Sequence, residues 1–215
     1  MADKMPIAVL ISGRGRTLRN ILDKIDANEL DVKINLVIGS KNCYGLQFAE
    51  KKNIPTDVVE SSQYSDIETF SEAVFAKCRR SMARYVVMAG YLSKLRIPHD
   101  FENRVLNIHP SLIPSFCGKG FYGRSVHEAA LRQGVKVSGC TVHFVDNEYD
   151  HGPIILQKVV PVLEDDTTDT LSDRVLYDAE FKAYPEALQL LAEKKIQIET
   201  VEGVSGDRQI VRILK

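Results

Sequence analysis

A short apolar run near the start of the chain, followed at once by a helical pattern, is the feature that most restricts its fold. Ile7 to Ile11 is continuously apolar and stops at Ser12-Gly13, as expected for a strand buried on both faces of a parallel sheet. Apolar residues then recur at i, i+3, i+4 and i+7, at Leu18, Ile21, Leu22 and Ile25. This stripe predicts an amphipathic helix that ends near Asn28.

The same alternation of strand and helix continues through the first hundred residues. Further strands are predicted at Ile34 to Ile38, Asp57 to Val59 and Tyr85 to Ala89. Between them we expect a helix near Tyr44 to Lys52 and another with an apolar face of Ile67, Phe70, Val74 and Cys78. Strands separated by helices of this length specify parallel βαβ units with right-handed crossovers. Residues 1–100 are therefore expected to form a Rossmann-like, phosphate-binding half.

Residues 101–197 are expected to form a second half. A short strand at Val105 to Ile108 precedes a glycine-rich loop from Pro114 to Gly123 and a helix at Ser125 to Gln133. Two longer strands, Val137 to Val145 and Ile154 to Val162, flank the polar turn Asp146 to Pro153, which fits an antiparallel pair or a wide loop between neighbours.

A last helix should begin near Thr170 with Asp169 as its cap, and Pro185 should kink or break it. In the tail, residues 203–215, Ile210 to Leu214 fits an edge strand or a loose end. We thus predict one domain, 1–215, in the α/β class: a Rossmann-like, doubly wound, mostly parallel sheet with helices on both faces and a C-terminal strand pair plus helix.

Composition excludes several classes of function. The 215 residues are 44% hydrophobic, enough for one substantial core, and 28 Lys and Arg nearly balance 29 Asp and Glu, so nucleic acid is not an expected partner. No segment reaches the roughly 20 apolar residues that span a bilayer, and the N-terminal run is too short for a signal peptide. We expect no membrane partner and a cytoplasmic location.

The four cysteines form no C-x-x-C pair, which argues against a structural zinc or a redox dithiol. Only Cys117 lies in a stretch that resembles an exposed loop, and nothing beside it in the sequence should lower its pKa. No metal is expected.

Ser12-Gly13-Arg14-Gly15-Arg16-Thr17 stands between the first strand and the first helix. Glycines permit close backbone approach, a helix N-terminus presents unpaired N–H groups, and two arginines add positive charge. The segment matches neither G-x-G-x-x-G nor a P-loop. We predict that Gly13, Arg14, Gly15, Arg16 and Thr17 bind a phosphate; the alternative is a tight turn with solvated arginines.

Asn107-Ile108-His109-Pro110 lies at the C-terminal end of a predicted strand, where ligand crevices form in α/β sheets. Alternation puts Asn107 and His109 on one face, about 6 to 7 Å apart. Asn107 offers an amide donor, and His109 an imidazole that can titrate near neutral pH. The pattern is equally compatible with a reaction centre and with a polar strand end satisfied by neighbouring loops.

The stretch from Gly139 to Pro153 carries a third group of polar residues. Thr141 and His143 share one face of a predicted strand, and Asp150 falls in the turn that follows. An aspartate in a turn before Gly-Pro is most often a turn former, and a strand histidine more often has a structural role. Residue types alone therefore leave the role of these three side chains open.

The segments N-I-H-P-S-L-I-P and G-C-T-V-H-F-V-D-x-x-x-D-x-G-P-I-I-L-Q together resemble the formyltransferase family of folate metabolism, and the similarity runs from about Ile7 to Lys195. The resemblance implies transfer of a formyl group from 10-formyltetrahydrofolate, a co-substrate, to the amine of phosphoribosylglycinamide in purine biosynthesis. The amine would attack the formyl carbon directly, through a tetrahedral intermediate and without metal. The partners would be these small molecules, and the enzyme a monomer or homodimer.

The resemblance also implies a role for each candidate residue. Asn107 and His109 would hydrogen-bond the oxygen that becomes negatively charged, and Asp150 would favour the cationic imidazole and receive the amine proton through water. Thr141 and His143 would support them. Glu180 would bind the ribose hydroxyls. Folate contacts would come from Met88, Tyr91, Leu92, Ser93, Lys94, Leu95, Val145 and Asp146.

Three departures from the family's pattern stand out, the second of which concerns two places in the chain. The phosphate loop reads Gly15-Arg16-Thr17 where G-S-N is common. One folate-facing arginine is absent from Leu92 to Leu95, and another is replaced near Asp66. The loop Cys117 to Arg124 is longer than in the family, and its Lys119 and Arg124 either reach an anionic substrate or are solvated. The acceptor is therefore the more open part of the prediction.

Other functions remain compatible with these residues. Water could be the acceptor, as in formyltetrahydrofolate hydrolases, although these carry an N-terminal regulatory domain that is not expected here. An amino sugar nucleotide could be the acceptor; initiator tRNA is less compatible because a C-terminal tRNA-binding domain is not expected. A folate or phosphate binding module of the same fold is the non-enzymatic alternative.

Overall fold

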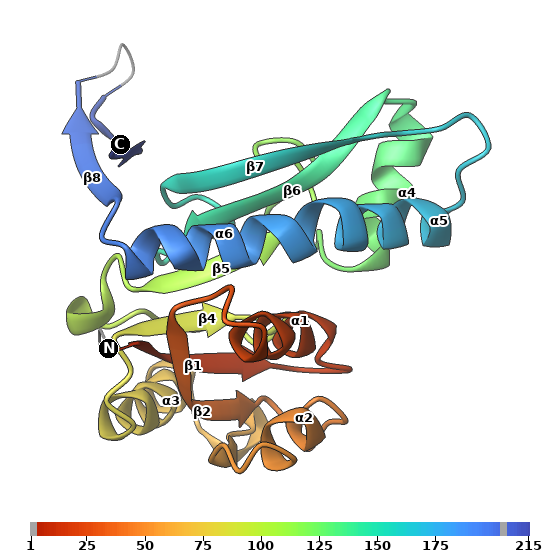
Figure 1. Ribbon diagram of the computed structural model, residues 1–215. Helices are drawn as coiled ribbons and strands as arrows, with labels where there is room; N and C mark the ends of the chain where they lie inside the picture. Colours follow the sequence, from red (N-terminus) through yellow and green to blue (C-terminus); the bar gives the residue numbers. More distant parts are fainter. Residues whose placement is uncertain (1–3, 203–205) are drawn as a thin grey trace. The chain divides into compact units, whose positions relative to one another are not determined.

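The computed structural model describes residues 4–202 and 206–215. The chain divides after Asn107 into two compact units (Figure 1). The expected single domain, with halves at 1–100 and 101–197, stays a prediction. Residues 203–205 of the expected tail lie outside the described part.

The first unit is built on parallel strands. Hydrogen bonds join them in the order β3-β2-β1-β4-β5, and every pairing between these neighbours is parallel. Their bounds are β1 Met5–Ile11, β2 Val32–Gly39, β3 Thr56–Val58, β4 Tyr85–Met88 and β5 Val105–His109. The strands expected from the apolar runs are therefore confirmed, each within two residues of its expected limits.

The strand order makes this unit doubly wound. The chain moves outward from β1 to β2 and β3, and then returns to the other side of β1 to form β4. Because such crossovers are right-handed, the outward and returning helices cover opposite faces of the sheet. The helices are α1 Arg16–Asp26, α2 Leu46–Glu50 and α3 Ile67–Arg80, with single 3-10 turns at η1 Ser61–Gln63 and η2 His99–Phe101.

This topology puts the switch point between β1 and β4, whose carboxyl ends lie side by side. Ligand crevices in open α/β sheets form at such points. Here the Ser12 N–H donates to the Gly90 carbonyl at 3.1 Å, and the Leu92 N–H donates to Ser12 Oγ at 2.9 Å. The two segments predicted to bind phosphate and folate thus meet at this edge.

The second unit contains an antiparallel strand pair and helices. Strand β6, Val137–Phe144, pairs antiparallel with β7, Ile154–Pro161. Of the two expected arrangements, an antiparallel pair or a wide loop between neighbours, the first is confirmed. Helix α4, Arg124–Gln133, precedes them and ends at Gly134, whose φ of 70° suits glycine.

The C-terminal helical segment differs from expectation in two ways. Helix α5, Thr168–Arg174, is capped by Thr167 in a capping box with Thr170, so Asp169 is not the cap but lies in the first turn. Pro185 does not break the helix: α6, Phe181–Ala192, continues through it. The irregular part lies earlier, at the π-helical turn η3, Val175–Glu180. Tertiary packing outweighs the local effect of the proline, since Pro185 and its neighbour Tyr184 are buried.

The described part of the tail, residues 206–215, contains one strand of an antiparallel pair. Strand β8, Ile196–Val201, pairs antiparallel with β9, Arg208–Ile213, in a separate two-stranded sheet. The tail is therefore neither loose nor an edge strand of the larger sheet. In the part of the chain that the structure describes, no helix combines the length and hydropathy needed to cross a bilayer.

Candidate functional site

Strand β5 ends in the two polar side chains singled out from the sequence. Asn107 is half-buried, and His109, two residues on, is 4% exposed. Asn107 pairs with Met88 of β4 in the parallel register. A strand end that presents a half-buried amide and a buried imidazole needs polar partners for both, because an unpaired buried polar group is costly.

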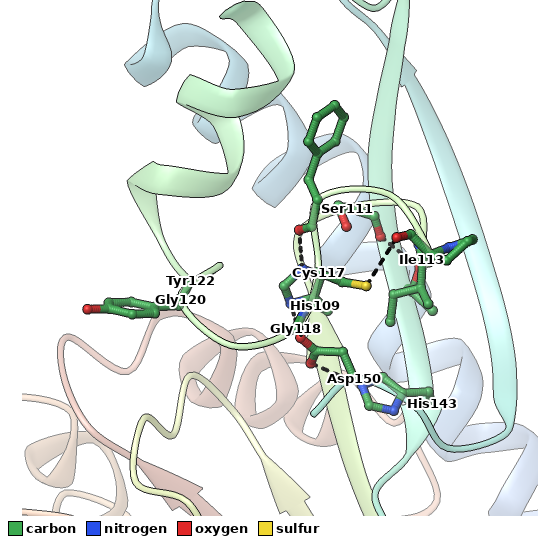
Figure 2. Close-up of polar contacts among 12 residues, drawn as sticks. His109, Ser111, Ile113, Cys117, Gly118, Gly120, Tyr122, His143 and Asp150 are labelled. Carbon is green, nitrogen blue, oxygen red and sulfur yellow. Dashed lines mark hydrogen bonds and ion pairs between the residues drawn. The ribbon is translucent and has the colours of Figure 1, made fainter. Parts of the chain in front are cut away.

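The ring of His109 has an acceptor beside each nitrogen (Figure 2). Nε2 lies 2.9 Å from the carbonyl oxygen of Phe116, and Nδ1 lies 3.6 Å from Oδ2 of Asp150. A carbonyl oxygen can only accept a hydrogen bond, so Nε2 must carry a proton. The carboxylate beside Nδ1 lies beyond the length of an ordinary hydrogen bond.

Asp150 sits in the turn after β6 with a left-handed backbone, φ 51°. Its side chain is 12% exposed and points toward His109 and His143 (Figure 2). The Gly118 N–H donates to Oδ2 at 2.8 Å, and His143 Nε2 lies 3.8 Å from Oδ1. The structure therefore brings together His109, His143 and Asp150, which come from three separate segments.

His143 is held in one orientation. Its Nδ1 lies 2.8 Å from the Phe144 carbonyl oxygen, which fixes the proton on Nδ1 and leaves Nε2 facing Asp150. Burial lowers the pKa of His143, which favours the neutral ring. Thr141, on the same strand, is fully buried and donates to the Ser111 carbonyl at 2.7 Å.

Sequence reasoning missed His127 and the backbone of the loop after β5. His127 is 3% exposed on α4, and burial, with the neighbouring charges of His109 and Arg124, lowers its pKa to about 4. The position of His127 beside Val126, within the apolar pattern of α4, could have indicated that this histidine is buried. Nothing in the sequence indicated the Phe116 carbonyl or the Gly118 amide, because every residue has these main-chain groups whatever its side chain.

Two charged side chains in this unit are occupied by local partners. Asp146, predicted to close over folate beside half-buried Val145, lies with Oδ2 2.7 Å from His151 Nδ1, and this contact raises the pKa of His151. Arg124 pairs with Asp169 and lies 3.7 Å from Glu128. This pairing favours the surface role of Arg124 over contact with a substrate.

The predicted phosphate loop has a close-packed backbone. Gly15 is the N-cap of α1 with φ 69°, and a Cβ there would lie 2.6 Å from the Cα of Gly45. Gly45 in turn donates its N–H to the Gly13 carbonyl at 3.0 Å. No side chain caps α1, and no acidic residue lies in its first turn. The loop therefore keeps the features that attract an anion.

The arginines of this loop border an open hollow on the first unit. Arg14 and Arg16 are exposed and line it with Arg19, Tyr44 and Phe48. Thr17 is buried instead, 7% exposed. The side chains of Arg14 and Arg16 are thus exposed at this hollow, whereas the side chain of Thr17 is covered.

The segment predicted to bind folate divides into core and surface. Tyr91 and Leu95 are buried, while Leu92 and Lys94 are exposed, and Met88 and Ser93 are half-buried. Burial raises the pKa of Tyr91. Only the backbone of Tyr91 and Leu95 is free for the predicted contacts, because their side chains fill the core of the first unit.

Glu180, predicted to bind ribose, is half-buried and ends the π-helical turn η3. Such turns occur frequently at functional sites. It belongs to the second unit, and the predicted phosphate loop belongs to the first.

The cysteines show no sign of activation. All four are free, and burial raises the pKa of Cys78 and of Cys140 to about 12. The pKa of Cys117 is also raised, by burial and by the charge of Asp150. Among the described residues, no group of three or more His, Cys, Asp or Glu side chains could hold a metal ion.

Comparison with known proteins gives the family. The profile described as Formyl transferase matches residues 5–188. The chain belongs to the formyl transferase family. The human trifunctional purine biosynthetic protein adenosine-3 is 41% identical over 198 residues, which are 91% of this chain and 19% of the human protein. The chain thus spans about a fifth of the length of the first curated relatives.

Solved structures of the family confirm the fold class. Glycinamide ribonucleotide transformylase 1 from Symbiobacterium toebii has a TM-score of 0.88 and 38% identity, covering 100% of this chain and 96% of that chain. A formyltetrahydrofolate deformylase from Pseudomonas syringae pv. tomato has a TM-score of 0.85 and 26% identity, covering 100% of this chain and 67% of that one. The family resemblance expected from the two sequence segments is therefore confirmed, and its members differ in the acceptor of the formyl group.

Proposed function

We propose that this chain transfers the formyl group of 10-formyltetrahydrofolate to the amine of phosphoribosylglycinamide, a step of purine biosynthesis. The observation that carries the proposal is the setting of His109, whose two ring nitrogens face the Phe116 carbonyl and the Asp150 carboxylate. That setting suits a cationic donor beside a proton acceptor, which direct formyl transfer to an amine requires.

The first task of the site is to stabilise negative charge. When the amine lone pair attacks the formyl carbon, the carbonyl oxygen becomes an oxyanion. Asn107 would donate from its amide, and His109 from Nδ1–H, whose 3.6 Å separation from Asp150 exceeds an ordinary hydrogen bond and leaves capacity for a second acceptor. Preorganised donors of this kind are the largest single contribution in many acyl transfers.

The second task is to move a proton. The attacking nitrogen becomes positively charged and must lose a proton, while the folate nitrogen must gain one as its bond to the formyl carbon breaks. Asp150 would accept the first proton through water and pass it on, so the net reaction consumes none. The neutral His143 has its proton on Nδ1, so its Nε2, 3.8 Å from Oδ1, adds no positive charge beside the carboxylate.

Recognition of the acceptor is assigned to the first unit and to Glu180. The loop from Gly13 to Thr17 would bind the phosphate through backbone N–H groups, with Arg14 and Arg16 adding charge. Glu180 would accept hydrogen bonds from the ribose hydroxyls. The folate would contact the backbone of Leu92 to Leu95, with Met88, Tyr91, Val145 and Asp146 beside it.

The test is an assay with 10-formyltetrahydrofolate in the presence and absence of phosphoribosylglycinamide, following both tetrahydrofolate and the formylated product. We expect release of tetrahydrofolate that depends on the acceptor and matches the formylated product one to one. An amino sugar nucleotide in a parallel reaction tests the other acceptor class. If the protein bound folate but showed no turnover under any of these conditions, a non-enzymatic binding module would be favoured instead.

Hydrolysis is the second candidate, because the deformylase from Pseudomonas syringae has the same fold at 26% identity. The same His109 and Asp150 would then activate water, and the products would be formate and tetrahydrofolate. Turnover that is equally fast without an amine acceptor would favour this reaction over transfer.

We also propose a cytoplasmic location and a monomeric or homodimeric state. The four unpaired cysteines fit a reducing compartment. Cell fractionation tests the location, and sedimentation equilibrium tests the oligomeric state.

A further inference from the structure

We propose that Gln157, on β7, is a positioning residue for the reaction centre. With Thr141 it braces the turn formed by residues 111–115, and this turn leads into the two main-chain groups that hold His109 and Asp150. The inference rests on the proposed formyl transfer at these two side chains. Gln157 itself has no contact with either of them among the hydrogen bonds and ion pairs that the structure assigns to it.

Thr141 is the junction of the brace. Its hydroxyl donates to the Ser111 carbonyl at 2.7 Å and accepts from the Ile113 N–H and from Gln157 Nε2, both at 3.0 Å. A hydroxyl has one donor and two acceptor sites, so all its capacity is used. Thr141 is fully buried, so loss of a partner would leave one of the three hydrogen-bonding positions of its hydroxyl unfilled and out of reach of water.

Gln157 completes the junction from the neighbouring strand. It stands opposite Thr141 in the antiparallel register of β6 and β7. Besides Thr141, its Nε2 donates to the Ile113 carbonyl at 3.0 Å. Both polar backbone groups of Ile113 are therefore held by side chains from the strand pair, which ties the turn to a regular, hydrogen-bonded part of the second unit.

The turn formed by residues 111–115 leads directly to the main-chain groups that contact His109 and Asp150. Within it, Ser111 Oγ donates to the Ser115 carbonyl at 2.6 Å. The next residue, Phe116, has a left-handed backbone with φ 50° and gives its carbonyl to His109 at 2.9 Å. Gly118 then gives its N–H to Asp150 at 2.8 Å. Figure 2 shows Ser111, Ile113, His109 and Asp150 gathered around this short segment.

The left-handed conformation of Phe116 makes the brace necessary. A non-glycine residue in this region is strained, so the segment would relax if the turn before it became loose. Relaxation would move the Phe116 carbonyl away from His109 and the Gly118 amide away from Asp150. Displacements of about 1 Å in a catalytic group can cost about a hundredfold in rate.

The test replaces Gln157 and measures both chemistry and geometry. Gln157→Leu removes the side-chain amide that donates to Thr141 and to the Ile113 carbonyl. Gln157→Glu keeps the shape of the side chain but places a carboxylate oxygen, which can only accept, against the same two oxygen atoms. Val159→Thr is the matched control, since Val159 is exposed on the same strand. Because Gln157 is itself exposed, we expect each variant to fold.

We expect Gln157→Leu and Gln157→Glu to lower kcat about tenfold, with KM for both substrates changed less than about twofold. In NMR spectra, the His109 Nε2–H and the Gly118 N–H should shift and exchange faster with water in both variants and not in Val159→Thr. Thr141→Val should reproduce these changes, and adding Gln157→Leu to it should lower kcat by less than the product of the two single effects, because the two side chains share one brace while Gln157 also holds the Ile113 carbonyl directly.

Unchanged His109 and Gly118 signals in both Gln157 variants would overturn the inference, whatever happens to kcat. The NMR measurement does not depend on the reaction. If the signals change but the wild-type protein transfers no formyl group, the brace is supported and the proposed function fails.

Discussion

The Gly118 N–H donates to the Asp150 carboxylate across 32 residues of sequence, at 2.8 Å. This bond ties the loop after β5, the strand that ends at His109, to the turn after β6, which contributes Asp150. A carboxylate that accepts a backbone N–H is fixed in orientation, and Asp150 also faces the ring nitrogens of two histidines. Of these neighbours, the Gly118 N–H needs only an acceptor oxygen, whereas the proposed cationic form of His109 needs the negative charge.

Asp150→Asn separates charge from shape. The amide retains an oxygen for the Gly118 N–H but cannot accept the amine proton or favour a cationic His109. We expect kcat to fall at least about a hundredfold, with little change in thermal stability. Steady-state kinetics and a thermal melt measure the two effects, and Asp169→Asn, on the surface beside Arg124, serves as the control. Turnover within a few-fold of wild type would remove Asp150 from the proposed mechanism.

The phosphate loop offers a matched pair of glycines. Gly15→Ala places a Cβ 2.6 Å from the Cα of Gly45 in a left-handed backbone, whereas a Cβ at Gly13 meets nothing within 4 Å. We expect Gly15→Ala to destabilise the protein by about 2 kcal/mol or more and Gly13→Ala by less than about 1 kcal/mol. Urea unfolding compares them. Equal stability of the two variants would show that the loop yields readily.

The fold was predictable where local pattern and tertiary structure agree. Ile7 to Ile11 is entirely buried in β1, as its unbroken apolar run predicts. Asn28 follows the end of α1 with φ 56°, a conformation that asparagine tolerates better than most residues. We expected Pro185 to kink or break its helix, and the break was wrong. The tendency of proline to end a helix was overridden by packing around buried Tyr184.

For the candidate site, the strand end indicated Asn107 and His109 and the family resemblance added Asp150, but neither indicated the groups that hold these side chains in place. His109 and Asp150 were predicted, and the structure brings them together at 3.6 Å. The Phe116 carbonyl and the Gly118 amide could not be predicted, since every residue carries these groups and only the folded path selects them. Gln157 ends a segment that resembles the family, yet its contacts with Thr141 and Ile113 depend on strand register.

Buried histidines should make stability depend on pH. The pKa of His127 is about 4 in the folded protein, below the ordinary value near 6.5, so the neutral ring favours folding. This contribution is complete above about pH 6.5 and is lost as the pH falls toward 4, to a total of about 3 kcal/mol. His143, whose pKa is also lowered, acts in the same direction.

The measurement is the free energy of unfolding at pH 7.5, 6 and 4.5 for the wild type and for His127→Leu. The variant has no ring to protonate, so its stability should fall less over this range, and the remaining slope reports His143 and the carboxylates. If the two curves run parallel, His127 does not contribute to the pH dependence.

The buried ion pair of Asp166 and Arg174 should be a main source of stability in the C-terminal helical segment. The two side chains are 2% and 18% exposed, and the guanidinium contacts both carboxylate oxygens, at 2.5 and 2.7 Å. Arg174 holds the pKa of Asp166 well below its ordinary value, with help from the Leu163 N–H and the Thr170 hydroxyl. Since the folded pKa is lowered, this stability is present above about pH 4 and is lost as the pH falls further.

Asp166→Asn removes the main counter-charge of the half-buried Arg174, whose remaining acidic neighbours are Asp165 and Asp178. We expect it to reduce the free energy of unfolding at pH 7 by about 3 kcal/mol, and Glu164→Gln, an exposed neighbour, to change it by less than about 0.5 kcal/mol. The difference between wild type and Asp166→Asn should shrink at pH 3, because Asp166 of the unfolded wild-type chain takes up a proton there while the folded carboxylate stays charged. If the difference in the free energy of unfolding stayed constant from pH 7 to pH 3, the charge of Asp166 would contribute nothing to stability. The effect of the variant would then come from hydrogen bonds that the asparagine amide does not replace.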